Sequence, residues 1–229
     1  MRSSRVSVTP RGPTRFADQP VVGHDAVAGS SFGPPKGPAV PRLPIEVRIA
    51  TPADADAVAR IYRPYVTHTA LTFDETPPSP DAFAQRIRQT LERDPFLVAE
   101  RDGGVVGFAY ASPRGSRASF RWSIDTAVYV DESAPRTGVG TALYGRLIPV
   151  LARQGYAKAY AVITMPNAPS VGLHESLGFR HVATLPAVGF KLGAWRDVGW
   201  WELPLMPALP KSPAEPKAFA AAMMTAESL

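Results

Sequence analysis

A glycine turn between an apolar run and a helical run constrains this chain more than any other feature of its sequence. Residues 126–130 are mostly apolar or β-branched, and Gly138 and Gly140 follow a polar turn. Apolar residues then recur at helical spacing (Val139, Leu143, Leu147). Glycine lets a phosphate approach the backbone, and the unpaired N–H groups of a first helical turn bind anions. The segment predicts an anion site, although the same pattern also suits an ordinary tight turn.

The composition argues against several classes of protein. The 229 residues include no cysteine and only four histidines, so we expect no disulfide, no zinc site and no other metal. The net charge is +5, but no basic patch with interleaved aromatic residues is visible, so we expect no nucleic-acid partner. No apolar run is long enough to span a membrane, and we expect a soluble, cytoplasmic protein.

Composition also divides the chain into three segments. Residues 1–44 are rich in Pro, Gly, Ser and Arg and predict a disordered tail. An organellar transit peptide shares part of this composition, but the frequent prolines argue against one. Residues 45–205 carry the apolar periodicity of one folded domain. Residues 206–229, rich in Pro, Ala and Lys, predict a flexible C-terminal tail.

Within the domain, the patterns predict an α+β fold. Helices are expected from Thr51 to about Pro64 and over residues 79–91, 139–151 and 169–177. Strands are expected over residues 45–49, 96–100, 105–111, 120–130, 159–164, 181–186 and 200–205. Hairpins come early and a strand–helix–strand crossover comes later, so we expect a mixed, mainly antiparallel sheet flanked by helices.

Two motifs connect the glycine turn to a known family. Arg136-Thr137-Gly138-Val139-Gly140 opens a helix, and Asn167-Ala168-Pro169-Ser170 and Leu173-His174-Glu175-Ser176-Leu177-Gly178-Phe179 follow downstream. Together they resemble the Gcn5-related N-acetyltransferase superfamily. Segments such as Thr72-Phe73, Val128-Tyr129-Val130 and residues 189–199 are similar to its phosphinothricin and methionine sulfoximine acetyltransferases. The resemblance covers nearly all of residues 45–205.

This resemblance implies an acyl-CoA N-acyltransferase fold, with a sheet splayed at a bulge, and acetyl-CoA as co-substrate. The diphosphate would bind the glycine turn, and the pantetheine arm would run beside a strand. An N–H near Tyr129 or Val130 would stabilise the thioester oxyanion. Asn167 would contact the cofactor, cap the next helix, or both. Pro135 replaces the usual Gln or Arg, so one phosphate contact is expected to differ. The residues implied for acetyl-CoA are Val128, Tyr129, Val130, Arg136, Thr137, Gly138, Val139, Gly140, Thr141 and Asn167.

The resemblance also implies direct acetyl transfer to the α-amino group of a small amino-acid-like compound in a ternary complex. Asp125, at the place of a family Glu, would act as general base through a bridging water. A surface Asp ending a strand is the alternative. His174 stands where many members carry a Tyr that reprotonates the thiolate. The alternative is a buried core histidine whose ring nitrogens are hydrogen-bonded. Phe73, Arg117 and Tyr129 would surround the acceptor.

The sequence differs from the phosphinothricin pattern at two positions, and it leaves two other functions open. Gly115 and Phe120 replace a Lys and a Tyr of the phosphinothricin pattern. A protein N-terminus or an aminoglycoside is a second kind of acceptor, and a non-catalytic acyl-CoA sensor is a different class of function. Family members often dimerise near the segment that matches Trp195 to Trp201, so we expect a homodimer with Trp200 and Trp201 exposed.

Overall fold

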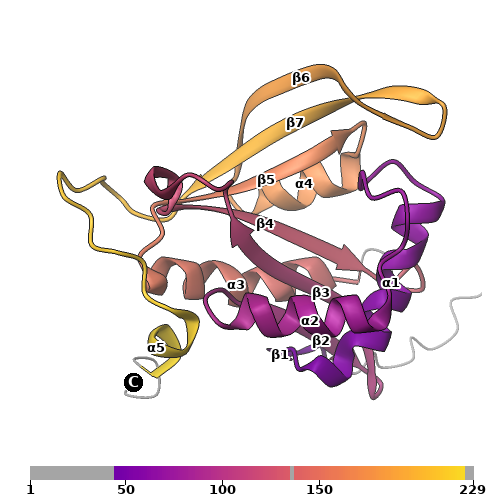
Figure 1. Cartoon of the computed structure of the whole chain (residues 1–229), viewed down its shortest axis with the longest axis horizontal. Helices are drawn as coiled ribbons and strands as arrows, with labels where there is room; N and C mark the ends of the chain where they lie inside the picture. Colours follow the sequence, from indigo (N-terminus) through magenta and orange to yellow (C-terminus); the bar gives the residue numbers. More distant parts are fainter. Residues whose placement is uncertain (1–43, 135–136, 225–229) are drawn as a thin grey trace, which may run out of the picture. The chain divides into compact units, whose positions relative to one another are not determined.

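The computed structural model describes residues 44–134 and 137–224, which belong to one compact unit. The predicted N-terminal tail therefore lies outside the described residues, apart from Pro44. An open sheet carries helices on both of its faces (Figure 1). Its strands are β1 (Glu46–Ile49), β2 (Phe96–Arg101), β3 (Gly104–Pro113), β4 (Ser123–Val130), β5 (Lys158–Met165), β6 (Arg180–Lys191) and β7 (Ala194–Pro204). The helices are α1 (Ala55–Thr67), α2 (Pro80–Leu91), α3 (Val139–Gln154), α4 (Ala168–Ser176) and α5 (Phe219–Met224), with short 3₁₀ turns η1 (Pro52–Asp54) and η2 (Ala118–Phe120).

The sheet has seven strands in the order β1-β2-β3-β4-β5-β7-β6. Its neighbours are antiparallel except for β4 and β5, which run parallel. The parallel pair is joined through α3, the crossover that the sequence indicates. The predicted mixed, mainly antiparallel α+β fold is confirmed.

The sheet opens between β4 and β5. The two strands pair only from Ser123–Lys158 to Asp125–Tyr160, and no pairing continues beyond that point. Each strand stays paired on its other side, β4 with β3 and β5 with β7, so the two halves of the sheet diverge at this short seam. A bulge was the expected cause. The β3–β4 register, however, is continuous from Gly107–Val130 to Pro113–Ile124, and the shift between Ala99 and Glu100 lies in the β2–β3 pairing.

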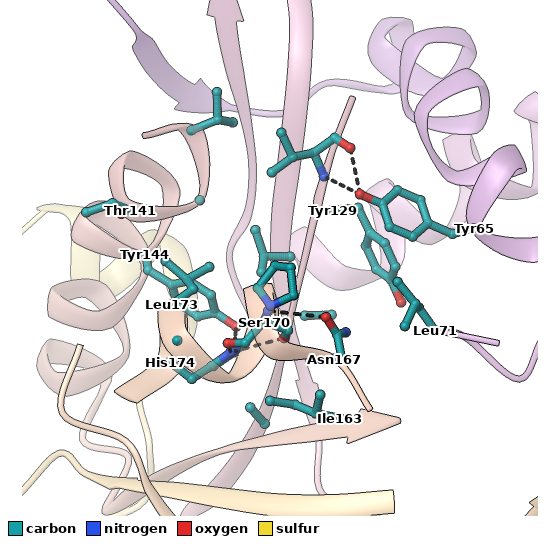
Figure 2. Close-up of a pocket in the computed structure, with 18 of the residues that line it drawn as sticks. Tyr65, Leu71, Tyr129, Thr141, Tyr144, Ile163, Asn167, Ser170, Leu173 and His174 are labelled. Atoms are coloured by element: carbon teal, nitrogen blue, oxygen red, sulfur yellow. Dashed lines mark hydrogen bonds between the residues drawn. The ribbon is translucent and has the colours of Figure 1, made fainter. Parts of the chain in front are cut away.

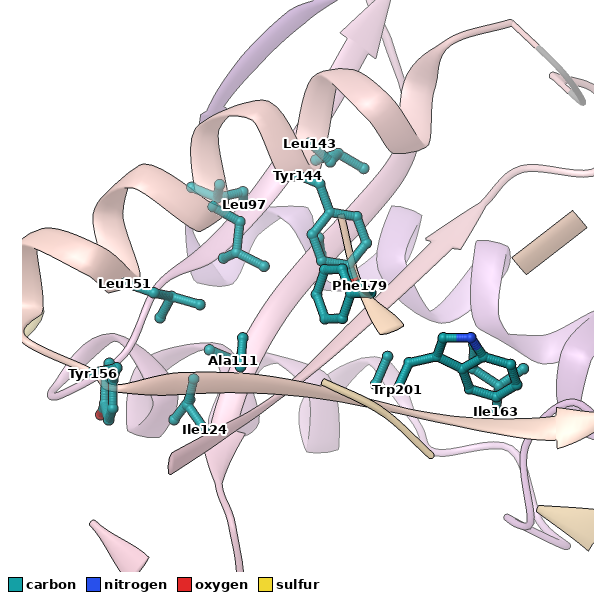
Figure 3. Packing of buried hydrophobic residues seen from close by; sticks show 14 of the residues in the cluster. Leu97, Ala111, Ile124, Leu143, Tyr144, Leu151, Tyr156, Ile163, Phe179 and Trp201 are labelled. Carbon is teal, nitrogen blue, oxygen red and sulfur yellow. The ribbon is translucent and has the colours of Figure 1, made fainter. Parts of the chain in front are cut away.

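Two apolar cores pack on opposite faces of the sheet. On one face, α3 places Leu143, Tyr144 and Leu151 against β4, β5 and β7, as Figure 3 shows. On the other face, α1 and α2 place Tyr62, Phe83 and Ile87 against Phe96 and Phe108. Strands β2 and β3 supply residues to both cores and are therefore covered on both sides.

Helix α1 continues past the proline that was expected to end it. Pro64 lies inside the helix, and the N–H of His68 still donates to the Pro64 carbonyl at 2.8 Å. Val66, only 2% exposed, packs beyond the proline and offsets the hydrogen bond that the ring removes. Helix α3 likewise runs through Pro149 to Gln154.

The C-terminal segment folds back onto the domain, where the sequence pattern indicates a flexible tail. The Gln154 amide donates to the carbonyls of Arg93 (2.8 Å) and Lys217 (2.9 Å), and the Trp122 indole N–H donates to Ala214 at 2.7 Å. Phe219 and Ala222 of α5 are buried against the domain. The apolar residues of this Pro- and Ala-rich stretch do not recur at a regular spacing, so the sequence pattern does not reveal the docking.

Replacing Phe219 by alanine should lower the free energy of unfolding by about 3 kcal/mol, because the buried ring leaves a cavity. Urea denaturation of the full chain measures this change. Leu209→Ala serves as control, since Leu209 belongs to the same segment and is 65% exposed. Equal stability of both variants and the wild type would show that the segment does not hold its docked position in solution.

Neither of the two tryptophans expected on the surface is fully exposed. Trp201 is 3% exposed and belongs to the core on the α3 face, so its predicted exposure is wrong, and Trp200 is half-buried. Trp195, on the β6–β7 hairpin, is 66% exposed. Among the residues that the structure describes, none of the helices has both the length and the apolar character that crossing a bilayer requires.

Candidate active site

A cleft of about 720 Å³ occupies the opening between β4 and β5. Figure 2 shows Tyr65, Leu71 and Tyr129 on one side of it and Tyr144, Leu173 and His174 on the other. Ten of the predicted site residues line it: Val128, Tyr129, Val130, Thr137, Gly138, Val139, Gly140, Thr141, Asn167 and His174. Arg136, also predicted, lies outside the described residues, as does Pro135.

The glycine turn forms one end of the cleft. Gly138 precedes α3 with φ of +83°, a left-handed conformation that favours glycine. The first hydrogen bond into the helix runs from the Ala142 N–H to the Gly138 carbonyl at 2.9 Å. The N–H groups of Val139, Gly140 and Thr141 therefore have no partner within the helix. They are the donors that an anion at this end of the cleft would use.

Gly140 allows α3 to lie close to α4. A Cβ at this position would come within 2.8 Å of the Leu173 Cδ2 atom. At the base of the turn, the Arg101 guanidinium donates to the Thr137 carbonyl at 3.1 Å, and the Thr137 hydroxyl donates to the Ala134 carbonyl at 2.8 Å. These contacts hold the turn in place.

The wall formed by β4 presents free backbone groups to the cleft. The Asp131 N–H donates to Val106 at 2.9 Å, so the odd-numbered residues of this stretch pair with β3. The backbone N–H and carbonyl of Val130 point away from β3, and both form hydrogen bonds with the Tyr65 hydroxyl (3.3 and 2.7 Å). Because backbone groups alternate in direction along a strand, the N–H and carbonyl of Val128 also point away from β3, into the opening between β4 and β5. Val128, rather than the expected Tyr129 or Val130, offers the open donor.

A chain of polar side chains closes the apex of the opening. Just past the last β4–β5 pair, the Thr126 hydroxyl donates to the Tyr160 carbonyl at 3.0 Å. The buried Tyr144 hydroxyl lies 3.1 Å from the Thr126 Oγ1 and 2.9 Å from the His174 Nε2. A side-chain hydrogen bond thus replaces the ladder where the strands part.

His174 is fixed at both ring nitrogens. It is 3% exposed, and its Nδ1 lies 2.7 Å from the Ser170 carbonyl, which can only accept. Nδ1 therefore carries the proton, and the unprotonated Nε2 lies against the Tyr144 hydroxyl, which donates to the Thr126 Oγ1. Burial lowers the pKa of His174 below its ordinary value of 6.5, and the Ser170 hydrogen bond opposes this only in part. The ring is held neutral.

This pKa shift predicts a pH dependence of stability. Below pH 6.5 the unfolded chain takes up a proton on His174 that the buried ring resists, so the free energy of unfolding should fall as the pH falls. Urea denaturation at about pH 7 and about pH 5 measures the slope, which His174→Gln should reduce. A slope that the substitution leaves unchanged would show that burial does not lower the pKa of His174.

Asp125 stands beside the cleft but does not line it. It belongs to the last β4–β5 pair, and it alternates along β4 with Ile124 and Thr126, which face α3. Its side chain therefore points to the α1–α2 face, as Tyr129 does. The Arg114 Nη1 donates to its Oδ1 at 2.6 Å. Burial raises the pKa of Asp125 above its ordinary value of 3.8, and the guanidinium partly offsets the rise.

The three residues expected around the acceptor lie in different surroundings. Tyr129 lines the cleft. The Phe73 ring, 40% exposed, lies where a Cβ on Gly189 would come within 2.2 Å, so it packs on the β6–β7 hairpin. Arg117 lines a second cavity of about 160 Å³ that includes Arg114. Asn167 has the capping role considered for it, because its Oδ1 accepts from the Ser170 N–H at 3.2 Å, and it also faces the cleft.

Comparison with known proteins identifies the family. The model of the acetyltransferase (GNAT) domain matches residues 47–200, which include the cleft. The chain belongs to the GNAT acetyltransferases. A phosphinothricin N-acetyltransferase of Streptomyces viridochromogenes is 39% identical over 175 residues, covering 76% of this chain and 96% of that protein. An L-methionine sulfoximine/L-methionine sulfone acetyltransferase of Salmonella typhimurium is 36% identical over 160 residues, covering 69% and 94%.

Solved structures agree with this GNAT assignment. A phosphinothricin acetyltransferase from Sinorhizobium meliloti, in complex with AcCoA, superimposes with a TM-score of 0.72 at 32% identity. The match covers 75% of this chain and 94% of that one. Within residues 44–134 and 137–224, no group of three or more metal-binding side chains lies together.

Four residues in or beside the cleft have no role assigned to them by the sequence patterns. Tyr65 and Tyr144 read as apolar positions on helix faces, Thr126 as part of a strand, and Arg114 as a loop residue. Their partners lie 11 to 65 positions away along the chain. Only the fold reveals that they meet at β4.

Proposed function

We propose that this chain transfers the acetyl group of acetyl-CoA to the α-amino group of a small amino-acid-like substrate of the phosphinothricin, methionine sulfoximine or methionine sulfone type. The single observation that carries this proposal is the opening between β4 and β5, because it places free backbone donors beside a glycine turn. The relatives named above supply the type of acceptor.

The cleft has the groups that acetyl-CoA needs. The free N–H groups of Val139, Gly140 and Thr141 suit the diphosphate. The free edge of β4 at Val128 can pair with the amide groups of the pantetheine arm in the manner of an added strand. The Val128 N–H is then the donor best placed for the thioester oxygen, where negative charge develops in the transition state.

The reaction is a direct attack. The neutral amine nitrogen bonds to the thioester carbonyl carbon, the C–S bond breaks, and CoA leaves as its thiolate. The proton that the ammonium must lose first passes to Asp125, directly or through a water. The raised pKa of this carboxyl brings it closer to that of the amine, which favours the transfer. The chain has no cysteine, so no cysteinyl acyl-enzyme can form.

The two substrates reach the reaction centre from opposite faces of the sheet. The pantetheine arm lies toward α3 and α4, where Tyr144 and His174 close the cleft. The acceptor enters from the α1–α2 face, where Asp125 and Tyr129 point. Because both nitrogens of His174 are engaged, we assign it the positioning of the Tyr144 hydroxyl rather than direct proton transfer to sulfur.

The assembly that we propose is a cytoplasmic homodimer that binds neither membranes nor nucleic acid. The β6–β7 hairpin exposes a series of apolar side chains, and Phe190 and Trp195 make an edge contact with ring centroids 5.4 Å apart. A second copy is the occupant that this face suits. Sedimentation equilibrium tests the dimer, and a monomer at every concentration would contradict it.

Release of CoA measured with a panel of amines tests the proposed function. Methionine sulfoximine, methionine sulfone and phosphinothricin should each be compared with a peptide bearing a free N-terminus and with an aminoglycoside. We expect turnover with the first group. Turnover with only the peptide or the aminoglycoside would change the acceptor, and tight acetyl-CoA binding without turnover on any amine would favour the acyl-CoA sensor.

A further inference from the structure

Arg114 is held in place unusually well for a loop residue. It directly follows β3, and its guanidinium lies between two aromatic rings, 3.8 Å from the ring centre of Tyr160 and 4.2 Å from that of Trp200. Its Nη1 also donates to Asp125 at 2.6 Å, and the side chain is 17% exposed. Stacking on both sides and an ion pair at the end fix the plane of the group.

Most of the hydrogen-bonding capacity of this pair is unused. A guanidinium has about five N–H donors, and the described residues provide one partner, Asp125, through one nitrogen. The Asp125 side chain is 32% exposed and accepts from Arg114 at Oδ1, so Oδ2 is left to accept from another donor. The Trp200 indole N–H is buried without a partner among the described residues, so the same wall holds a further donor.

The pair lies close to the cleft. Ala127 lines the cleft and lies on the same face of β4 as Asp125, about 7 Å further along the strand. The Arg114 side chain lies over Tyr160 of β5, which forms the last pair with Asp125 before the strands part. A fixed positive group and a negative group therefore stand side by side next to the cleft, on the α1–α2 face of the sheet.

We propose that Arg114 determines acceptor specificity by binding the carboxylate of an amino acid whose ammonium group is bound by Asp125. An α-amino acid carries these two charges on one carbon, so neighbouring charges of opposite sign in the protein match it. This inference rests on the proposed function and adds the requirement for a free carboxylate. Amines without an acidic group leave the spare guanidinium donors unpaired in a half-buried site.

The test compares an amino acid with its own carboxamide. In the full-length protein, kcat/KM is measured at one pH for methionine sulfone and for methionine sulfone amide, whose carboxylate is replaced by a neutral group. The wild type should prefer the acid by at least about tenfold. Arg114→Met should reduce that preference to about onefold, and Arg114→Lys should restore little of it, since an ammonium cannot stack between two rings or present a planar fork.

Matched variants separate this role from a structural one. Arg121→Met removes another cation of the same loop, which pairs with Glu215, and should leave the acid-to-amide ratio unchanged. Arg117→Met tests the neighbouring arginine of the second cavity. The affinity for CoA, measured by calorimetry, should be unchanged in Arg114→Met, Arg117→Met and Arg121→Met. It thereby reports folding independently of the acceptor.

Three results would overturn the inference. The first is a wild-type enzyme that is active on both compounds with equal kcat/KM. The second is an active Arg114→Met enzyme with the wild-type ratio, and the third is a collapse of the ratio in Arg117→Met but not in Arg114→Met. Should Arg114→Met fail to fold, Arg114→Lys and the wild-type ratio decide the question. A wild type that acetylates no amine at all contradicts the proposed function instead.

Discussion

Asp125→Asn is expected to lower kcat/KM for the acceptor amine about 1,000-fold at neutral pH, the range typical of a lost general base. The carboxamide keeps the size of the side chain and can still accept from Arg114, so the surroundings should change little. At neutral pH an α-amino group with a pKa of about 8 is mostly protonated, and the variant has no group to take its proton. Steady-state kinetics with saturating acetyl-CoA measure the loss.

The pH dependence distinguishes a lost base from a disturbed fold. As the pH rises past the pKa of the amine, the free amine needs no base, and the defect of Asp125→Asn should shrink. Asp125→Glu, which keeps the carboxylate, should stay within about tenfold of the wild type. A defect that is equally large at all pH values, or an asparagine variant with full activity, would remove Asp125 from the mechanism.

Gly138→Val should weaken acetyl-CoA binding at least about 30-fold. Gly138 has φ of +83°, where a β-branched residue is strained by roughly 1–3 kcal/mol. The turn must therefore adopt another conformation, and the N–H groups of Val139, Gly140 and Thr141 then no longer converge on one anion. Isothermal titration with CoA measures this effect without any need for turnover.

Two substitutions control for the change at this glycine. Gly145→Ala lies in the same helix, where an added Cβ meets nothing within 4 Å, and should leave CoA affinity unchanged. Gly138→Asn should keep much of the affinity, because asparagine tolerates the left-handed conformation better than valine. Wild-type affinity in Gly138→Val would show that the turn does not bind the diphosphate.

The local parts of the site could be predicted from the sequence. The glycine turn is a contiguous segment in which strand, turn and helix each carry their own signal, and all its described residues line the cleft. Asn167 and His174 belong to a second contiguous motif and reach the same cleft. In both motifs the chemistry is carried by neighbours in the chain.

The parts that depend on distant contacts could not be predicted. The ion pair of Arg114 with Asp125 and the polar chain from Thr126 to His174 join separate elements. The opening of the sheet was predicted, but its cause was not: a seam of three pairs, rather than a bulge, is visible only in the pairing of strands. The docking of Phe219 likewise depends on a core that the tail sequence does not describe.

Initial-velocity kinetics with both substrates varied test the central claim most directly. With acetyl-CoA and methionine sulfone, we expect intersecting lines in a double-reciprocal plot and one N-acetyl product per CoA released, as direct attack in a ternary complex requires. Parallel lines, or CoA release without an N-acetylated amino acid, would contradict the account.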